Sequence, residues 1–193
     1  SVNRLTNEKR VDLQVEAFRM LPDHKLIIVG GYDTNNASLV ENLIEKGILE
    51  VVDNNFIRDD TPRLLSIANE IFKAYNNYMK IVHFAEMSVI AAAISMNSEA
   101  IVIDEKTTRF LIENPGLIVE ILKKTLHTPI GINENNLKEF NNTAKNIKAI
   151  RSIELATIAY EHGLLDSYIT KIADARKNLL EGMLWGLKLN GCA

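Results

Sequence analysis

Apolar residues recur at helical spacing in several stretches of the chain, and short continuous apolar runs separate these stretches. Residues 86–96 carry four apolar positions at that spacing, Val89, Ile90, Ala93 and Ile94, which predict a helix with one buried face. Residues 100–103, Ala-Ile-Val-Ile, form a continuous apolar run that is too short for a globular helix. Such a run between helices is typical of a strand in a parallel sheet that is covered on both faces. The pattern therefore predicts an α/β fold with a parallel sheet flanked by helices.

The remaining elements are expected from the same patterns and from the residues that bound them. Helices are expected at 37–46, 62–79, 117–126, 134–146 and 164–189, and short strands at 26–29 and 128–132. Residues 48–52 fit either a strand or a segment that leads from a helix into a loop. Gly47 and Gly163 are placed to close two helices, and Pro62 to open one after a polar connection at 54–61. The C-terminal region is therefore expected to be mainly helical.

Composition places the chain among ordinary globular proteins. With 193 residues, of which 47% are hydrophobic and 24% charged, the chain is long enough for one sizeable core. We expect a single α/β domain over 1–193, with an N-terminal segment 1–33, a core 34–148 and C-terminal helices 149–193. The net charge of −3 counts against a nucleic-acid binder because such domains are usually basic, although a local basic patch can coexist with an acidic total.

The single cysteine and the lengths of the apolar runs indicate the cellular setting. Cys192 has no partner for an internal disulfide, so a reducing cytoplasm is expected. No apolar run approaches the length that spans a bilayer, so no membrane partner is expected. Trp185 and Gly186 near the end of the C-terminal helix predict packing against the body of the protein or against a second subunit, which would form a homo-oligomer.

Carboxylates stand at both ends of the helix–strand pair formed by 86–96 and 100–103. Asp104 directly follows the strand, and ligands of open parallel sheets bind beyond the carboxyl ends of the strands. An aspartate after a strand is also an ordinary N-cap, and Glu105 is ordinary first-turn charge. Glu86 stands at the head of the helix, so we expect it to approach Asp104 at one edge of the sheet. Position alone leaves the ligand and cap interpretations of Asp104 open.

Two tyrosines in the predicted helix 62–79 have two interpretations. Tyr75 and Tyr78 lie near Lys73 and Lys80 in the sequence, which places the rings to stack single-stranded bases beside phosphate contacts. Aromatic residues at helical spacing more often belong to the core. The helical prediction therefore favours burial of both rings.

Glu-Met-Ser at 86–88 precedes the small-residue helix, and Val-Ile-Asp-Glu-Lys-Thr-Thr-Arg follows at 102–109. This arrangement resembles the middle of PIN-domain proteins, especially archaeal ones. The Arg151–Glu154 spacing and the ending Leu-Leu-Glu-Gly-Met-Leu-Trp-Gly-Leu-Lys resemble an uncharacterised archaeal PIN-like group. The resemblance implies a PIN-like α/β fold and a divalent-metal-dependent ribonuclease activity.

The same resemblance implies a set of carboxylate metal ligands. Glu86 and Asp104 are the expected ligands and catalytic groups, with Glu154 as a third catalytic candidate and Glu105 as a further ligand candidate. Asp33 belongs to an Asp-Thr-Asn triplet like the one that opens most PIN domains, where the aspartate is the first ligand. Here two glycines and a tyrosine separate Asp33 from the strand before it. A cap of the following helix is the alternative role for Asp33.

Oxygen-only ligands select hard divalent cations, so the expected cofactor is Mg²⁺ or Mn²⁺. Such ions activate water for in-line attack and stabilise the leaving oxygen. Lys106, Arg109 and Arg151 are the expected phosphate contacts on an RNA substrate. The alternative function is a catalytically degenerate PIN-like module that binds RNA or a protein, which the altered region of Asp33 and the acidic net charge favour. Binding of a divalent metal separates these two functions.

The N-terminal segment carries a second set of motifs, Arg-Leu at 4–5, Glu-Lys at 8–9 and Val-Gly-Gly at 29–31. These motifs resemble the start of the C-terminal nucleotide-binding domain of GT-B glycosyltransferases. The resemblance implies that Arg4 and Lys9 bind a sugar-nucleotide diphosphate, whose oxygens two cations can neutralise separately. A fragment of such a glycosyltransferase is therefore a further alternative. The rest of the donor site is not recognisable after residue 33, so we expect no sugar transfer by this chain alone.

Overall fold

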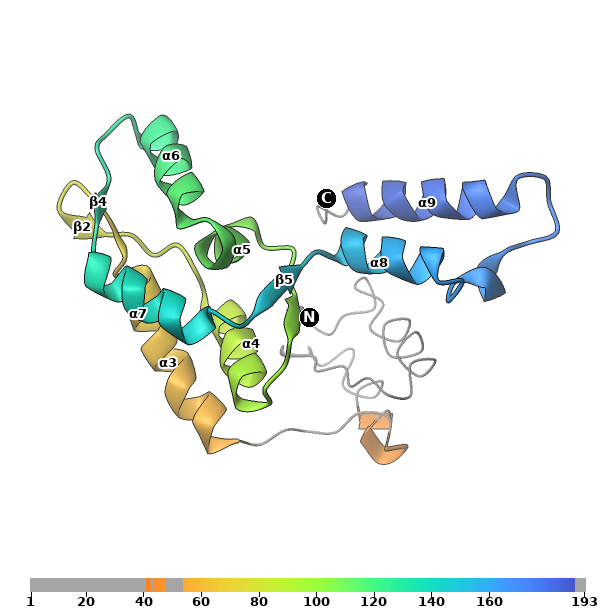
Figure 1. Ribbon diagram of the computed structural model, residues 1–193, viewed down its shortest axis with the longest axis horizontal. Helices are drawn as coiled ribbons and strands as arrows, with labels where there is room; N and C mark the ends of the chain where they lie inside the picture. The colour runs from red at the N-terminus through yellow and green to blue at the C-terminus, as the bar shows by residue number, and fades with distance from the viewer. Residues whose placement is uncertain (1–40, 43, 48–53, 190–193) are drawn as a thin grey trace. The chain divides into compact units, whose positions relative to one another are not determined.

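The computed structural model describes residues 41–42, 44–47 and 54–189 (Figure 1). The chain divides into two compact units, one holding the described residues 54–149 and the other holding 41–42, 44–47 and 150–189. The predicted elements at 26–29 and 48–52 lie outside the described residues, and so do Arg4, Lys9 and Asp33.

The described part of the first unit mixes helices with short strands. The helices are α3 (Asn55–Asn69), α4 (Phe84–Ser95), α5 (Lys106–Glu113), α6 (Pro115–Leu126) and α7 (Glu134–Ala144). The strands are β1 (Phe72–Ala74), β2 (Asn77–Tyr78), β3 (Ala100–Val102), β4 (Gly131–Ile132) and β5 (Lys148–Ile150), whose last residue begins the second unit.

The strands form two small sheets. Strands β2, β1 and β4 pair in that order as an antiparallel sheet, whereas β3 pairs with β5 in a small parallel sheet. The predicted α/β class is confirmed at this level, and so are the strand at 100–103 and the helices at 117–126 and 134–146. The antiparallel sheet and strand β5 were not predicted.

The core of the first unit lies where α3 packs between α4 and α7 (Figure 1). Each of these helices contributes side chains with no exposed surface, namely Leu64 and Ala68 from α3, Met87 and Ile90 from α4, and Phe140 from α7. Burying one large apolar side chain stabilises a fold by about 1.5–3 kcal/mol. These contacts therefore hold the three helices as one body.

Helix α3 begins earlier than the sequence predicts. The predicted polar connection at 54–61 and the predicted helix start at Pro62 are wrong, because the helix starts at Asn55 with Asn54 as its N-cap. The side-chain Oδ1 of Asn54 accepts a hydrogen bond from Phe56 N at 2.8 Å. Pro62 lies inside the helix, where its missing N–H removes one helical hydrogen bond. A strong local cap thus outweighs the usual position of proline in the first turn.

The predicted helix 62–79 ends at Asn69 and gives way to a β-hairpin. Strands β1 and β2 pair with Lys73 opposite Tyr78, which leaves Tyr75 and Asn76 as a two-residue turn. Both turn residues have positive φ, 51° for Tyr75 and 65° for Asn76, as two-residue hairpin turns require. The alternating burial of β1, in which Lys73 stands between two buried neighbours, is that of a strand.

Asn69, the last residue of α3, fixes the path of the chain into α4. Its Oδ1 accepts hydrogen bonds from Ile81 N at 2.7 Å and from Val82 N at 3.0 Å. Its Nδ2 donates to Val82 O at 3.0 Å. One side chain thus satisfies three backbone groups of a part-buried segment that belongs to no helix or strand. These groups would otherwise be desolvated without partners.

Helix α4 confirms the helix predicted at 86–96, but it is buried on more than one face. Met87, Ser88, Ala91 and Ala92 are buried in addition to the predicted positions, whereas Ile94 is only half-buried. A helix that is apolar all round is expected to be enclosed by its neighbours.

Helix α4 ends in a Schellman motif at Asn97, which has φ of 50°. Ser98 N donates to Ala93 O at 2.8 Å and Asn97 N donates to Ile94 O at 3.1 Å. The motif reverses the chain, so that β3 runs back along α4.

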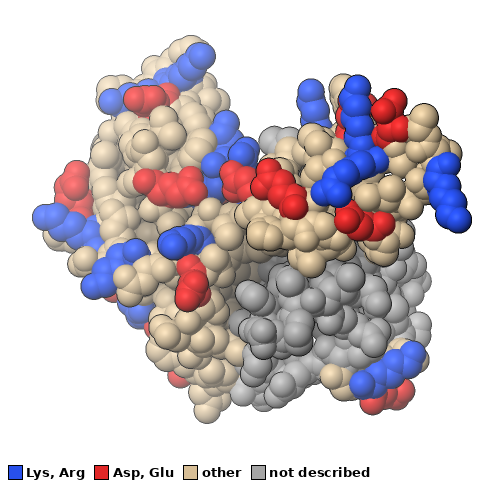
Figure 2. Space-filling model, turned by 45° about the vertical axis from the view of Figure 1, so that its right-hand side comes forward, with Lys and Arg blue, Asp and Glu red and all other residues tan. Residues whose placement is uncertain are grey.

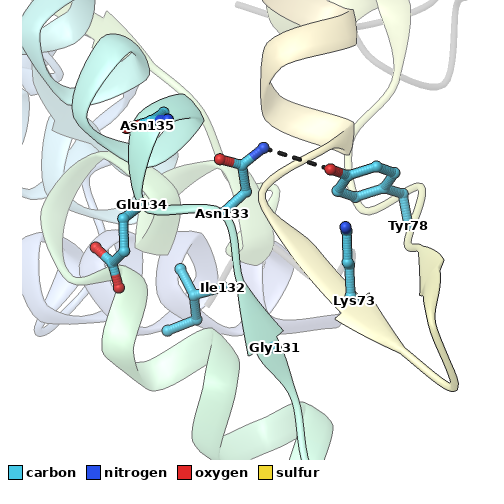
Figure 3. Close-up of a pocket in the computed structure, with 7 residues that line it drawn as sticks. All are labelled: Lys73, Tyr78, Gly131, Ile132, Asn133, Glu134 and Asn135. Carbon is cyan, nitrogen blue, oxygen red and sulfur yellow. Dashed lines mark hydrogen bonds between the residues drawn. The ribbon is translucent and has the colours of Figure 1, made fainter.

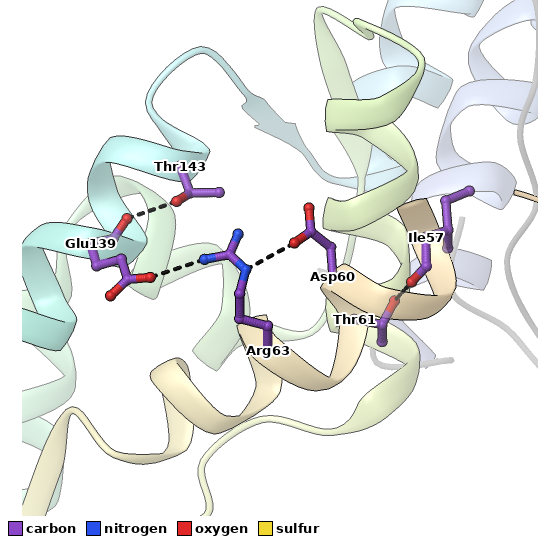
Figure 4. Close-up of polar contacts among 6 residues, drawn as sticks. All are labelled: Ile57, Asp60, Thr61, Arg63, Glu139 and Thr143. Atoms are coloured by element: carbon purple, nitrogen blue, oxygen red, sulfur yellow. Dashed lines mark hydrogen bonds and ion pairs between the residues drawn. The ribbon is translucent and has the colours of Figure 1, made fainter. Parts of the chain in front are cut away.

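An ion-pair network ties α3 to α7 at the surface (Figure 4). Arg63 Nε lies 2.8 Å from Asp60 Oδ1, and Arg63 Nη1 lies 2.9 Å from Glu139 Oε1. The hydrogen bond with Asp60 and, to a smaller extent, the charge of Glu139 raise the pKa of Arg63 despite the cost of desolvation. Because the network is exposed, its contribution to stability is small beside that of the buried apolar contacts.

The described part of the second unit is a helical pair, α8 (Ser152–Glu161) and α9 (Ala175–Leu189), with a short 3₁₀ helix at Asp166–Tyr168. The prediction of a mainly helical C-terminal region is confirmed, but the predicted helix 164–189 is wrong before Ala175. Gly163, with φ of 73°, closes α8 as predicted, and Gly47, with φ of 65°, ends the helical turn before it.

Helix α9 presents apolar surface, because Trp185 is 60% exposed and Leu189 is 80% exposed. A homo-oligomer contact through this helix stays a prediction. Among the helices in the described part of the chain, none has the length and apolar character to cross a membrane.

Replacing Asn69 with alanine is expected to destabilise the first unit by about 2 kcal/mol or more, because two N–H groups and one carbonyl lose their partner in a part-buried position. Urea unfolding followed by circular dichroism measures the change. Asn142→Ala is the matched control, since Asn142 is an exposed asparagine of α7. Equal stability of the two variants would contradict the role given to Asn69.

Candidate functional site

The local geometry predicts that Glu86 and Asp104 lie toward one end of the α4–β3 pair. From Met96 back to Glu86 the helix rises by about 15 Å. From Ala100 to Asp104 the extended chain covers about 13 Å, which is a similar length. Because the chain reverses at Asn97 and β3 contacts α4, this path is expected to carry both residues toward the same end of the pair.

The carboxylate of Glu86 is unusual for a charged group in the first turn of a helix. Its Oε2 atom is buried and has no hydrogen-bond partner. The helix dipole favours a negative charge at this position, but it supplies no partner for the oxygen. A buried charged oxygen is costly unless it is paired, protonated or bound to an ion. Glu86 is therefore the strongest single indication of a ligand site in the first unit.

A second buried polar atom without a hydrogen-bond partner lies on α5. Arg109 Nε has none, although Arg109 Nη1 lies 3.5 Å from Glu113 Oε2. Thr108 Oγ1 is the only other such atom among the described residues. All three atoms belong to the starts of α4 and α5, the two helices that flank strand β3 in the sequence.

Asp104 is half-buried and lies two residues after Val102, the last residue of β3. The interpretation of Asp104 as the N-cap of the next helix is wrong, because the N-cap of α5 is Glu105. The two carboxylate oxygens of Glu105 accept hydrogen bonds from Thr107 N at 2.8 Å and from Thr108 N at 2.6 Å. The cap thus uses Glu105 and not Asp104.

The electrostatic state of Glu105 follows from these contacts. Burial alone would raise the pKa of its carboxyl, but the hydrogen bonds from Thr108 and Thr107 outweigh burial and lower the pKa below its ordinary value of 4.5. Glu105 is therefore ionised at neutral pH while both of its oxygens bind the helix. Its role in the structure is that of a cap.

The predicted phosphate contacts Lys106 and Arg109 share the first turns of α5 with an aromatic ring. Lys106 Nζ lies 5.3 Å and Arg109 Cζ lies 5.1 Å from the centroid of the Phe110 ring. Lys106 is exposed and Arg109 is half-buried. Two cations therefore lie within five residues after Asp104 in the chain.

Arg151 and Glu154 belong to the second unit, where they bind each other. Arg151 Nη2 lies 2.7 Å from Glu154 Oε1, and Arg151 N donates to Glu154 Oε2 at 2.9 Å. This arrangement caps the N-terminus of α8. The spacing that resembles a family motif thus has a structural role in this helix.

A divalent ion would find two carboxylates in the first unit, Glu86 and Asp104. Within the described residues no group of three or more His, Cys, Asp or Glu side chains is placed to hold a metal. Mg²⁺ usually keeps several waters and binds protein through one or two carboxylates, so a pair of ligands fits its chemistry. The buried oxygen of Glu86, which has no hydrogen-bond partner, also fits the chemistry of a cation ligand.

A pocket of about 510 Å³ between the β1–β2 hairpin and the start of α7 was not predicted from the sequence (Figure 3). Lys73, Tyr78 and residues 131–135 line the pocket. The Nζ of Lys73 lies 4.2 Å from the centroid of the Tyr78 ring, and Asn133 Nδ2 donates to the Tyr78 hydroxyl at 3.4 Å. The signal in the sequence is Asn76, because asparagine suits the left-handed backbone of a two-residue hairpin turn, whereas Tyr75 does not.

Comparisons with protein-family models, with curated proteins and with solved structures found no match to this chain. The geometry of the chain itself is therefore the basis for assigning a function.

Replacing Glu105 with glutamine is expected to lower the free energy of unfolding by about 1 kcal/mol at neutral pH, as for other lost helix caps. The folded-state pKa of Glu105 is lowered, so its stabilising effect is present above pH 4.5 and is lost as the pH falls through the folded-state value. Urea unfolding at about pH 7 and about pH 3 should show a difference between wild type and variant that shrinks in acid. Glu120→Gln, an exposed glutamate of α6, is the control; a difference that grows in acid would contradict the assigned cap.

Proposed function

We propose that the chain is a PIN-like, Mg²⁺- or Mn²⁺-dependent ribonuclease whose metal ligands include Glu86 and Asp104. The observation that carries the proposal is the buried Oε2 of Glu86, which has no hydrogen-bond partner. A cation at this oxygen would supply the missing partner and compensate the buried charge. The parallel pair β3–β5, with Asp104 two residues after the last residue of β3, supports the PIN-like arrangement.

The residues around the site suit binding of a phosphodiester. When bound, the ion would activate water and stabilise the leaving oxygen. Glu86 and Asp104 would hold the ion at the end of the α4–β3 pair. Lys106, exposed at the start of α5, and Arg109, one turn later, would contact phosphate oxygens of the RNA. The Glu113 carboxylate that lies 3.5 Å from Arg109 would compete with phosphate for the guanidinium.

A second candidate function is a catalytically degenerate module of the same fold that binds RNA or a protein. Two observations favour it. The described residues contain no group of three metal-ligating side chains, and the chain has a net charge of −3. Figure 2 shows the basic side chains of the described residues interspersed with acidic ones, so the face drawn has no broad field of one sign. The glycosyltransferase-fragment alternative depends on Arg4 and Lys9, which lie outside the described residues.

Saturating Mn²⁺ is expected to raise the melting temperature of the wild-type chain by several degrees. Binding at 100 times the dissociation constant stabilises the folded state by about 2.7 kcal/mol, and each 1 kcal/mol is worth about 2–4 °C in a chain of this size. Glu86→Gln and Asp104→Asn should lose most of this rise. In EDTA, Glu86→Gln should be about as stable as wild type, because the buried Oε2 of Glu86 makes no hydrogen bond that the variant could lose.

Glu120→Gln is the control for these melts. It removes an exposed carboxylate of α6 and changes the net charge by the same amount as Glu86→Gln and Asp104→Asn. It should retain the full response to Mn²⁺. An equal rise in Glu86→Gln and in wild type would place any metal site elsewhere.

Cleavage of a fluorescent single-stranded RNA separates the nuclease from the degenerate module. In Mn²⁺ the wild-type chain should cleave the RNA, and Glu86→Gln should reduce the rate by at least the roughly 100-fold that disturbing a metal ligand's surroundings can cost. Gel electrophoresis of the products over time measures both rates. A wild-type chain that binds Mn²⁺ and RNA but leaves the RNA intact would support the degenerate module instead.

A further inference from the structure

The β1–β2 hairpin presents two aromatic rings on the surface of the first unit. Tyr75 is 70% exposed and Tyr78 is 43% exposed. The sequence-based preference for burial of both rings is wrong, because it depended on a helix that ends at Asn69. Exposed rings on a hairpin are placed to contact a partner.

Tyr75 occupies a backbone conformation that bulky residues rarely adopt. Its φ is 51°, in the left-handed region that favours glycine and asparagine. Two-residue hairpin turns strongly prefer those small residues at this position. Folding alone therefore does not account for an exposed tyrosine at this turn.

The hydroxyl of Tyr75 joins the hairpin to the end of α6. It donates a hydrogen bond to Leu126 O at 3.3 Å. Lys123 and Lys124 occupy the last turn of α6, within one turn of Leu126, and both are exposed. The ring of Tyr75 thus lies near two lysines that are distant in sequence.

The ring of Tyr78 forms one wall of the 510 Å³ pocket, and Lys73 lies against it (Figure 3). Asn133 holds the Tyr78 hydroxyl, and Asn135 adds a further exposed amide to the lining. Glu134 is the one carboxylate among the seven lining residues. We name Lys73, Tyr75, Tyr78, Lys123 and Lys124 the hairpin surface. It combines two rings with three amines in a chain whose net charge is −3.

We propose that the hairpin surface binds single-stranded RNA. Bases stack on Tyr75 and beside Tyr78, while Lys73, Lys123 and Lys124 contact phosphates. Aromatic rings interleaved with cations are the general means of holding single strands, because every base has a face to stack and every nucleotide carries a charge. A duplex keeps its bases paired and hides those faces. The choice of RNA and not DNA as the ligand rests on the proposed function, and the rest of the inference does not.

Fluorescence anisotropy with a labelled oligouridylate of about 12 nucleotides tests the inference, in EDTA so that no metal contributes. Tyr75→Asn removes the ring and places a favoured residue in the left-handed turn, so the fold is retained, as a thermal melt would verify. This variant should lose affinity by about five-fold or more. Tyr75→Phe, which keeps the ring, should bind within about two-fold of wild type.

Salt dependence tests the lysines separately. The double variant Lys123→Gln, Lys124→Gln should lower the slope of log affinity against log salt by about 1.4, since each phosphate contact on a single strand contributes about 0.7. Lys171→Gln, an exposed lysine of the second unit, should leave affinity and slope unchanged.

Three outcomes would overturn the inference. They are equal affinities of Tyr75→Asn and wild type, tighter binding to duplex RNA than to the single strand, and displacement of the RNA by polyglutamate at equal charge, which would assign the surface to an acidic protein. Failure of the nuclease proposal is distinguishable, because Mn²⁺ binding through Glu86 and RNA binding through Tyr75 are measured independently. RNA binding that needs Tyr75 in a chain without Mn²⁺ binding would support the hairpin surface alone.

Discussion

The first unit depends on the three hydrogen bonds that the side chain of Asn69 makes with Ile81 and Val82. They close the loop that contains the hairpin, because Asn69 ends α3 and Val82 stands just before α4. Such a hydrogen bond adds little net stability, because the backbone group would bind water in the unfolded chain. Its loss is costly, because the part-buried group is then left without a partner. The packing of α4 on α3 and the position of Glu86 at the head of α4 therefore both depend on one amide side chain.

The same loop gives the hairpin its exposure. Because Asn69 holds both ends of the loop, the antiparallel pair β1–β2 is held at its base while Tyr75 and Tyr78 face outward. Strand β4 pairs with β1 from the other side and leads directly to the N-cap of α7, Asn133. The pocket beside Tyr78 is thus a consequence of how the chain joins α3, α4 and α7.

The sequence predicts best the parts where local pattern and tertiary burial agree. The apolar run 100–103 has no exposed residue, since each of its residues is half-buried or buried. Gly163 follows α8 at a position with positive φ, which suits glycine. Prediction failed where a side chain replaced a backbone partner. Asn54 starts α3 ahead of Pro62, and Asn69 ends it although apolar residues continue at helical spacing beyond it. The spacing of apolar residues does not predict such side-chain hydrogen bonds.

The two carboxylates of the candidate site could be identified from the sequence. Their hydrogen bonds and burial could not. The order of helix and strand predicts that Glu86 and Asp104 lie toward one end of their pair, and this stays a prediction. Which of Asp104 and Glu105 caps α5 depends on where the helix begins. It begins at Lys106, so Glu105 is the N-cap and accepts hydrogen bonds from Thr107 N and Thr108 N. The burial of Glu86 Oε2 depends on packing around α4 that one sequence does not report.

Direct titration of Mn²⁺ by electron paramagnetic resonance is the measurement that tests the central claim, that Glu86 is a metal ligand. The six-line signal of free Mn²⁺ should fall as wild-type chain or Glu120→Gln is added, because ions bound to the protein lose that signal. Glu86→Gln should leave the signal of free Mn²⁺ at the level of a protein-free sample. Equal loss of signal with wild type and Glu86→Gln would contradict the claim.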